Sequence, residues 1–317
     1  MNLLDRQLLF VTGKGGVGKT TIAAAIALLA SRQGRRVLVC EMDAKGSMAA
    51  AFDCPPFPYK ERHIEAELFG MAMNTEDSLR EYLKLFVRIP FVGRIGPLAR
   101  TFDFVADAAP GVKEILAIGK LCYEVRERHY DLVVVDADAS GHIVSQIGAP
   151  RVINDLIQVG LVREQTKWML EILDDPARTG LVAVTTAEEM PVNETVEMLA
   201  AVGEQTKVSV AAIIANRVLP ALFNTREADA FDQLCTPAAQ AILIKAVGEP
   251  IATVMEGARL NEVRRRLGAV HLEHLRQGVA PLVKSGCPLV FVPELFTRAA
   301  GRRVVNLVAE ALGEELL

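Results

Sequence analysis

A glycine-rich loop close to the start of the chain holds the residues best suited to bind phosphate. Residues 13–21 read GKGGVGKTT and fit the pattern G-x-x-x-x-G-K-[ST], in which glycines let backbone N–H groups wrap around phosphate oxygens. In this pattern Lys19 reaches the outer phosphates and the Thr20 hydroxyl ligates Mg²⁺. A nucleoside triphosphate and Mg²⁺ are therefore the predicted ligands. The predicted phosphate-binding residues are Gly13, Lys14, Gly15, Gly16, Val17, Gly18, Lys19, Thr20 and Thr21.

The segments on either side of this loop are those that the pattern requires. Residues 7–12 (QLLFVT) form the apolar run of a buried strand. Residues 20–32 (TTIAAAIALLASR) are rich in Ala, Leu and Ile and are followed by Gly34, as expected of a helix and its end. A strand before the loop and a helix after it direct the helix N-terminus at the phosphates. A chance glycine-rich turn is the weaker interpretation.

Lys14, directly after the first glycine, has two interpretations. It is either a solvated loop lysine or a second cation for the phosphates. A lysine that points out of the loop cannot easily fold back onto its own nucleotide. It can reach a nucleotide across a two-fold interface, as an arginine finger does in trans. Under the second interpretation Lys14 is a catalytic residue and the protein works as a dimer.

Two aspartates follow strand-like runs and are candidates for the metal and for water. Asp136 ends the run DLVVVD, where an acidic residue can hold Mg²⁺, usually through water. Asp43 ends the run VLVCEMD and could orient the attacking water beside the γ-phosphate. A turn residue at a strand end is the alternative for Asp43.

Short apolar runs alternate with helical patterns along the chain. This order predicts an α/β fold: a doubly wound, mainly parallel sheet with a P-loop NTPase core and its site at the carboxyl ends of the strands. We expect one domain over residues 1–317. The predicted strands are Leu8–Thr12, Val37–Met42, Leu132–Asp136, Leu181–Thr185, Val210–Ala215 and Leu289–Val292.

The distance between the second and third predicted strands is far longer than a simple crossover needs. We predict that residues 55–130, together with 151–178, form a helical subdomain inserted in this domain. A further helical insert is expected over 224–278. The many apolar residues of 79–104 either pack the core of the subdomain or line a groove for a partner.

Composition excludes several classes of protein. With 35 Lys and Arg against 39 Asp and Glu, the net charge is −4, which gives no nucleic-acid footprint. No apolar run is long enough to span a bilayer. The strand that precedes the glycine-rich loop begins within the first ten residues and leaves no room for a signal segment, so a cytoplasmic location is expected. The five cysteines form no C-x-x-C pair and are expected to be reduced thiols.

Several motifs together resemble one family. GKGGVGKTT resembles the deviant Walker A loop of the MinD/ParA, nitrogenase iron protein and ArsA ATPases. APGVKEILAIGKL (109–121) and LVAVTTAEEMPVNETVEML (181–199) resemble the helix before Walker B and the E-x-x-x-x-E-T helix of the branch that holds ArsA and the tail-anchored-protein targeting ATPases. The best match is the bacterial, single-domain ArsA-like type, with one nucleotide site per chain.

The resemblance implies roles for further residues. Asp43 would position water in the first switch, although Ala44 and Lys45 replace the proline and alanine of the DPAH form. DADASGH (136–142) resembles the second switch DTAPTGH, in which Gly141 would swing toward the γ-phosphate. Asp138 is either part of the metal shell or a solvated loop acid.

The nucleobase is expected to be adenine. The chain lacks an N/T-K-x-D stretch of the kind that a guanine-specific site carries. AAIIANR (211–217) resembles the family strand that ends in an adenine-reading Asn, here Asn216, which could instead be a capping or turn residue. PLVFVPELFTR (288–298) resembles the loop that closes over adenine, with Pro293 and Glu294 at its centre.

The predicted function is therefore a Mg²⁺-dependent ATPase that acts as a dimeric switch and couples ATP to a helical subdomain that binds a client. The partner is a second copy or a paralogous subunit, and the client is an apolar segment or a membrane-associated protein. The missing cysteine motifs argue against arsenite activation, zinc and an iron–sulfur cluster. The alternative is a non-catalytic, nucleotide-dependent scaffold subunit of a heterodimer.

Overall fold

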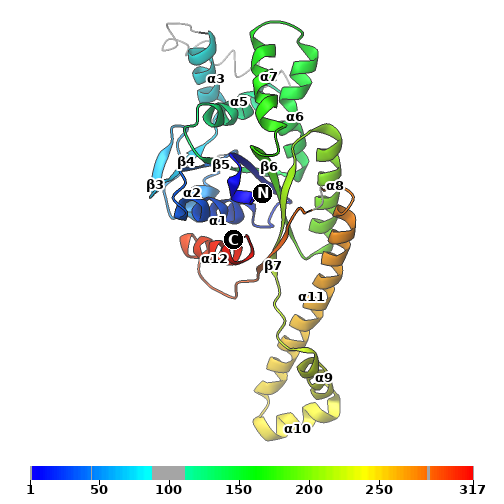
Figure 1. Ribbon diagram of the computed structural model, residues 1–317. Helices are drawn as coiled ribbons and strands as arrows, with labels where there is room; N and C mark the ends of the chain where they lie inside the picture. Colours follow the sequence, from blue (N-terminus) through cyan, green and yellow to red (C-terminus); the bar gives the residue numbers. More distant parts are fainter. Residues whose placement is uncertain (1, 44, 88–110, 284–285, 317) are drawn as a thin grey trace.

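A single eight-stranded sheet forms the centre of the protein in the computed structural model, which describes residues 2–43, 45–87, 111–283 and 286–316 (Figure 1). The strand order is β3-β4-β2-β5-β1-β6-β7-β8. All neighbouring pairs are parallel except β3 and β4, which are antiparallel. The strands are β1 (Leu8–Gly13), β2 (Val37–Glu41), β3 (Arg62–Glu65), β4 (Leu68–Ala72), β5 (Leu132–Ala139), β6 (Thr179–Thr186), β7 (Val210–Val218) and β8 (Leu289–Pro293).

Helices cover both faces of this sheet. Alternate residues of β1 enter two separate cores, as expected of a strand buried on both sides. Leu9 and Val11 pack with α1 and α12, whereas Leu8 and Phe10 pack with α5, α6 and α8. The helices are α1 (Lys19–Arg32), α2 (Ser47–Ala51), α3 (Thr75–Tyr82), α5 (Val112–Arg126), α6 (Ser140–Leu156), α7 (Leu161–Leu173), α8 (Glu189–Gln205), α9 (Thr225–Leu234), α10 (Pro237–Val247), α11 (Pro250–Val279) and α12 (Arg302–Leu316), with short helical turns η1 (Leu3–Asp5) and η2 (Leu83–Val87). The predicted doubly wound α/β fold is confirmed.

Two strands were missed by the sequence analysis. β3 and β4 lie inside the range 55–130 that was predicted to be helical, and they extend the sheet beyond β2. β3 reads RHIE and is only partly buried at the sheet edge, so it lacks an apolar run. β4 contains Gly70, where a Cβ would lie 2.5 Å from the Phe57 ring, so close packing replaces a bulky strand residue.

Helices α5, α6 and α7 pack on the face of the sheet opposite α1 and α12, and α3 packs on α5 (Figure 1). They fall largely within the predicted subdomain, whose bounds of 55–130 and 151–178 stay a prediction. The apolar segment 79–104 is described only as far as Val87, and its remaining residues lie outside the described ranges.

An arm made of α9, α10 and α11 extends from the opposite side of the molecule, with α9 and α10 at its tip (Figure 1). It agrees with the helical insert predicted for 224–278. The base of α11 packs tightly on α8, because a Cβ at Gly278 would lie 2.8 Å from the Val196 side chain. Among the described residues, no helix is long and apolar enough to cross a membrane.

Candidate nucleotide site

The loop between β1 and α1 depends on glycine at two positions. Gly13 ends β1 so close to β6 that a Cβ would lie 2.0 Å from the carbonyl oxygen of Val184. Gly18 has a φ of 93°, and a Cβ there would lie 2.4 Å from the Asn216 amide nitrogen. Any side chain at either position would push the loop away from the sheet. The spacing of the motif thus reflects two close backbone contacts.

The loop presents backbone donors and one lysine to the same space. α1 begins at Lys19, and its N-cap Gly18 offers no side chain to the first turn, which leaves N–H groups for an anion. The Lys19 ammonium donates to the Lys14 carbonyl at 3.3 Å. Burial lowers the pKa of Lys19, and the nearby Asp136 and Asp138 oppose that shift.

Thr20 and Asp136 form the contact expected of a magnesium site. The Thr20 hydroxyl donates to Oδ2 of Asp136 at 2.7 Å, and Oδ1 of Asp136 is buried without a hydrogen-bond partner. Burial raises the pKa of Asp136 to about 6, although the Thr20 hydrogen bond and Lys19 act in the other direction. A buried carboxylate with a free oxygen next to a threonine hydroxyl suits a hard cation.

Glu41 was missed by the sequence analysis. It lies beside Asp136 in the register of β2 and β5, and it is only 2% exposed. Its Oε1 accepts from the backbone N–H of Ser47 at 2.6 Å and of Met48 at 3.3 Å, which ties β2 to the start of α2. Its Oε2 is buried without a partner. The sequence signal was an acidic residue inside an otherwise apolar strand.

These groups surround one cavity of about 680 Å³. Its lining comes from the glycine-rich loop, the ends of β2 and β5, and the start of α6. These segments lie at the carboxyl ends of the neighbouring strands β1, β2 and β5. The lining includes Lys19, Thr20, Glu41, Asp43, Asp136 and His142. The glycine cradle and the unpartnered carboxylate oxygens fit a phosphate chain and Mg²⁺. No group of three or more His, Cys, Asp or Glu that could hold a metal ion is found in the described ranges.

Asp43 lines this cavity, and its role in orienting water stays a prediction. Its carboxylate forms an ion pair with Lys45, and both side chains are more than half exposed. Ala44 between them lies outside the described residues. Asp43 therefore shares the cavity with Thr20 and Asp136 while its carboxylate is paired with Lys45.

The second predicted switch borders the same cavity. Gly141 is the second residue of α6, and a Cβ there would meet nothing within 4 Å. Asp138 just before the helix accepts a hydrogen bond from the Gln146 amide, and the Asp138 carbonyl accepts from Thr12 at 2.8 Å. These contacts hold Asp138 to the protein and leave Gly141 in open space.

Lys14 makes a contact that the sequence analysis did not foresee. Its ammonium forms an ion pair with Glu194 on α8 of the same chain. Oε2 of Glu194 accepts a hydrogen bond from the Ser140 hydroxyl at 3.5 Å. The E-x-x-x-x-E-T pattern contained Glu194, but nothing in the spacing indicates which lysine it meets.

Asn216 and the predicted adenine loop lie apart from the phosphate cavity. The Asn216 amide, 6% exposed, donates to the Val17 carbonyl at 2.8 Å, and its oxygen accepts from the N–H of Arg217 at 3.0 Å. The amide nitrogen thus braces the glycine-rich loop, and the amide oxygen is engaged by the backbone of the next residue. Glu294 lines a second cavity of about 720 Å³, together with Arg217 and residues of α11. The adenine roles of Asn216, Pro293 and Glu294 stay predictions.

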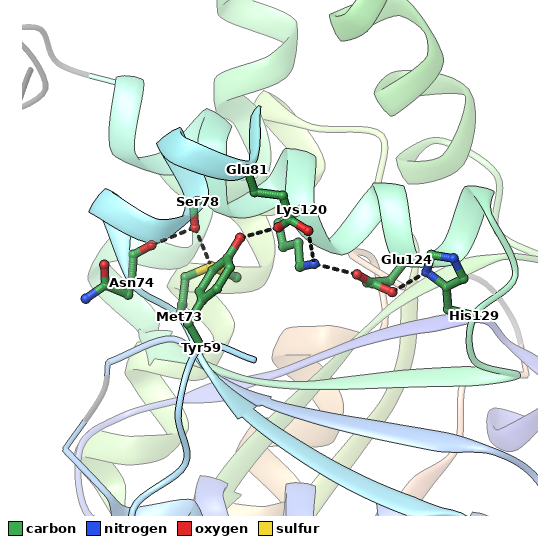
Figure 2. Close-up of polar contacts among 8 residues, drawn as sticks. All are labelled: Tyr59, Met73, Asn74, Ser78, Glu81, Lys120, Glu124 and His129. Carbon is green, nitrogen blue, oxygen red and sulfur yellow. Dashed lines mark hydrogen bonds and ion pairs between the residues drawn. The ribbon is translucent and has the colours of Figure 1, made fainter. Parts of the chain in front are cut away.

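A third cavity, of about 300 Å³, lies among α3, α5, α6 and α7 and has a mainly apolar lining. Its walls include Leu79, Leu85, Ile115, Leu116, Ile153 and Met169. A chain of polar contacts runs along one side, from Tyr59 through Glu81, Lys120 and Glu124 to His129 (Figure 2). Only Glu81 and Lys120 of this chain line the cavity. The cavity therefore offers apolar walls and one charged edge.

The fold and the loop geometry define a P-loop nucleotide-binding protein of the α/β class. The chain matches the anion-transporting ATPase family over residues 6–170 and 158–236, and it belongs to this family. The matched ranges end before α10 and α11 of the arm. The resemblance stated from the sequence is confirmed.

Individual relatives support the same assignment. The chain is 33% identical to ATPase BagA of Mycobacterium tuberculosis over 226 residues, which cover 68% of this chain and 66% of that protein. It is 25% identical over 246 residues to putative arsenical pump-driving ATPase 2 of Aquifex aeolicus, covering 68% of this chain and 81% of the relative. It is 30% identical over 157 residues to ATPase get3 of Schizosaccharomyces japonicus, and the match covers 48% of this chain and 47% of that protein.

Proposed function

We propose that this protein hydrolyses Mg²⁺-ATP and works as a dimeric switch, in which the nucleotide state of the phosphate cavity sets the state of the apolar cavity. One observation carries the first part. Thr20 and Asp136 are in hydrogen-bond contact at 2.7 Å beside a glycine-rich loop, and Asp136 keeps a buried oxygen without a partner. This is the set of groups that a nucleotide-bound Mg²⁺ requires.

ATP and Mg²⁺ would be held by the groups that already surround the cavity. The loop N–H groups and Lys19 would bind the phosphates, and Thr20 and Asp136 would hold the metal, the latter through water. Bound Mg²⁺ neutralises charge on the phosphate oxygens. Asp43 would orient a water at the cavity rim once its carboxylate leaves Lys45.

The coupling is proposed to run through α6. This helix begins at Ser140, beside the phosphate cavity, and its residue Ile153 lines the apolar cavity. Between these ends, Ile143 and Ile147 are fully or almost fully buried against the sheet. A packed helix transmits a displacement at one end to the other, because its interior contacts are not continuously deformable.

The apolar cavity is the proposed site for an apolar segment of a client or partner protein. Exposed apolar side chains continue from its wall along the end of α6 and the start of α7. They are Val152, Leu156, Ile157, Val159, Leu161 and Val162. A contiguous apolar surface beside an apolar cavity is characteristic of a protein-binding site.

The dimer is proposed to be closed by ATP, with each Lys14 contacting the nucleotide of the opposite subunit. The partner is a second copy or a paralogous subunit. Lys14 lies in a loop whose neighbours Gly15 and Gly16 face open space, so its side chain has room to turn outward.

The test measures steady-state ATP hydrolysis of Lys14→Ala and Asp43→Asn in the presence of Mg²⁺. We expect each rate to fall about 10²-fold or more, because each change removes a group that acts on the transferring phosphoryl group or its water. The matched controls are Lys207→Ala and Asp229→Asn, two exposed residues away from the cavity, and these should keep the wild-type rate. Wild-type rates in both test variants would exclude this mechanism.

A non-catalytic, nucleotide-dependent scaffold subunit is the second candidate. One observation favours it, namely the ion pair of Asp43 with Lys45, because it engages the carboxylate that hydrolysis needs. A scaffold would bind Mg²⁺-ATP tightly without turnover. Lys45→Ala separates the two functions, since it should leave a scaffold without turnover and leave an ATPase active.

A further inference from the structure

Glu194 contacts both the glycine-rich loop and the start of α6, the two segments that border the phosphate cavity. We infer that Glu194 is a positioning residue that holds Lys14 inside its own subunit and releases it when nucleotide binds. Closure of the dimer then has a threshold, which is the free energy needed to break the ion pair of Lys14 with Glu194. The inference rests on the proposed function, in which Lys14 acts across the dimer. It adds the residue that opposes this action.

The contacts of Glu194 are specific. One carboxylate oxygen pairs with the Lys14 ammonium, and the other accepts from the Ser140 hydroxyl at 3.5 Å. The side chains of Lys14 and Glu194 are 26% and 34% exposed, so the pair is partly shielded from water. A shielded ion pair is stronger than the fully solvated pairs of the surface.

Lys14 is the partner that can move. Glu194 is flanked on α8 by Val192 and Thr195, which are at most 1% exposed, so packing fixes the backbone of Glu194. Lys14 lies in a loop next to Gly15, where a Cβ would meet nothing within 4 Å. Separation of the pair therefore moves the lysine and leaves α8 in place.

Competition for a single charge creates the threshold. The Lys14 ammonium cannot pair with Glu194 and bind a phosphate of the opposite subunit at the same time. Closure of the dimer must therefore replace one charge pair by another, and the free energy of the first pair is subtracted from the gain. Removal of Glu194 lowers this cost.

The second contact makes the release depend on the nucleotide. Ser140 is the first residue of α6 and precedes Gly141, the residue expected to swing toward the γ-phosphate. A displacement of Ser140 removes the hydrogen bond that orients the Glu194 carboxylate toward Lys14, at the stage when the opposite nucleotide becomes available to Lys14. The carboxylate thus senses the segments on both sides of the cavity.

The first experiment needs no nucleotide. The rate at which acetic anhydride modifies Lys14 in the nucleotide-free protein is followed by mass spectrometry in the wild type, in Glu194→Gln and in Glu197→Gln. Glu197 is the matched control, because it is exposed on the same helix one turn away and forms no ion pair with a described residue. We expect Glu194→Gln to raise the rate several-fold, since the amine no longer has to leave a carboxylate. Equal rates in all three proteins would overturn the inference.

The second experiment follows dimerisation by sedimentation velocity as the non-hydrolysable analogue AMP-PNP is added with Mg²⁺. Glu194→Gln should lower the analogue concentration for half-maximal dimer about two- to fivefold, the effect of releasing one partly exposed ion pair. The shift should vanish in a Lys14→Ala background. An unchanged midpoint, or a loss of dimer in Glu194→Gln, would overturn the inference and leave the proposed function standing.

Failure of the proposed function has a different result. If the wild-type protein binds Mg²⁺-AMP-PNP without forming a dimer, and Glu194→Gln does the same, no trans contact of Lys14 exists. That result overturns the threshold as well as the switch, whatever the rate of Lys14 modification.

Discussion

The phosphate cavity and the apolar cavity differ in how the chain builds them. The carboxyl ends of parallel strands and the segments that follow them form the first, and they supply charged groups such as Lys19, Glu41 and Asp136. Packed helices form the second, with mainly aliphatic walls. Fixed charges can select a ligand by its chemistry, whereas aliphatic walls select it by size and shape. The protein thus combines one chemically selective site with one permissive site, and α6 reaches both.

The largest effect is expected at the selective site. Lys19→Ala should reduce ATP hydrolysis about 10²- to 10³-fold, because it removes the cation that contacts the outer phosphates. Binding of the fluorescent apolar probe ANS to the nucleotide-free protein should stay unchanged, since Lys19 is not part of the apolar cavity. A parallel loss of ANS binding would show that the two cavities are not independent in the absence of nucleotide. Lys207→Ala is the matched control.

The buried charge of the selective site should have a measurable cost. Burial raises the pKa of Asp136 from 3.8 to about 6, so the folded protein holds this proton more tightly than the unfolded chain does. Without metal and nucleotide, the contribution of Asp136 to stability should therefore fall as the pH rises from about 4 to about 6, and stay low above pH 6. Asp136→Asn should stabilise the metal-free protein at pH 7.5 by up to about 3 kcal/mol, and much less at pH 4.

Urea denaturation at the two pH values measures this difference. Asp229→Asn serves as the control, because Asp229 is exposed on α9 and its substitution should change stability at neither pH. The same stability of wild type and Asp136→Asn at pH 7.5 would show that the buried carboxylate carries no penalty. The Asp136 carboxylate in the phosphate cavity would then be better solvated than its burial indicates.

The permissive site should respond to volume alone. Gly119 of α5 faces this cavity, and a Cβ there would lie 2.9 Å from the terminal methyl group of Met169, which is flexible enough to move. Gly119→Leu should fill the cavity and weaken ANS binding about tenfold, the effect of losing most of one apolar contact surface. The affinity for Mg²⁺-ATP should not change.

Gly203→Leu provides the matched control for this change. Gly203 is also inside a helix, and a Cβ there would meet nothing within 4 Å. The substitution Gly203→Leu raises helix propensity by the same amount as Gly119→Leu, but its side chain does not enter the apolar cavity. Unchanged ANS binding in Gly119→Leu would mean that the probe binds elsewhere, for example on the exposed apolar side chains of α6 and α7.

The smallest effect is expected at the polar edge of the permissive site. The hydroxyl of Tyr59 donates to Glu81, and burial raises the pKa of Tyr59, so this hydroxyl stays protonated (Figure 2). Tyr59→Phe should lower the free energy of unfolding by about 1 kcal/mol, the usual loss for one hydrogen bond, and should leave ATP hydrolysis unchanged. Differential scanning calorimetry and an ATPase assay measure both. A loss of hydrolysis would give this edge a functional role.

Much of the sheet could be predicted because strands buried on both faces are continuous apolar runs. β1, β2, β5, β6 and β7 have this pattern, and β8 is also an apolar run, although it lies at the sheet edge and alternate residues are only partly buried. β3 and β4 could not be recognised in this way. The polar sequence of β3 reflects its place at the edge, and Gly70 of β4 reflects close packing with Phe57, which only the folded chain reveals.

The candidate site divides along a similar line. A local motif or the end of an apolar strand made four residues recognisable in the sequence, and all four line one cavity: Lys19, Thr20, Asp43 and Asp136. Glu194 meets Lys14 across 180 positions of the chain, a pairing that no local pattern encodes. Asn216 was assigned to the base from its strand context, but its amide braces Val17 of the loop at 2.8 Å.

The length of the arm converts a small tilt at its base into a large displacement at its tip. α11 has 30 residues, which at 1.5 Å per residue makes it about 45 Å long. Its base is pressed against α8, where a Cβ at Gly278 would lie 2.8 Å from the Val196 side chain. A rigid rod of this length turns a tilt of about 10° at its base into a displacement of about 8 Å at its far end. A tilt of α11 too small to detect at its base would therefore be easy to detect at α9 and α10, so a spin label or fluorophore at that tip would be a sensitive reporter of any such tilt.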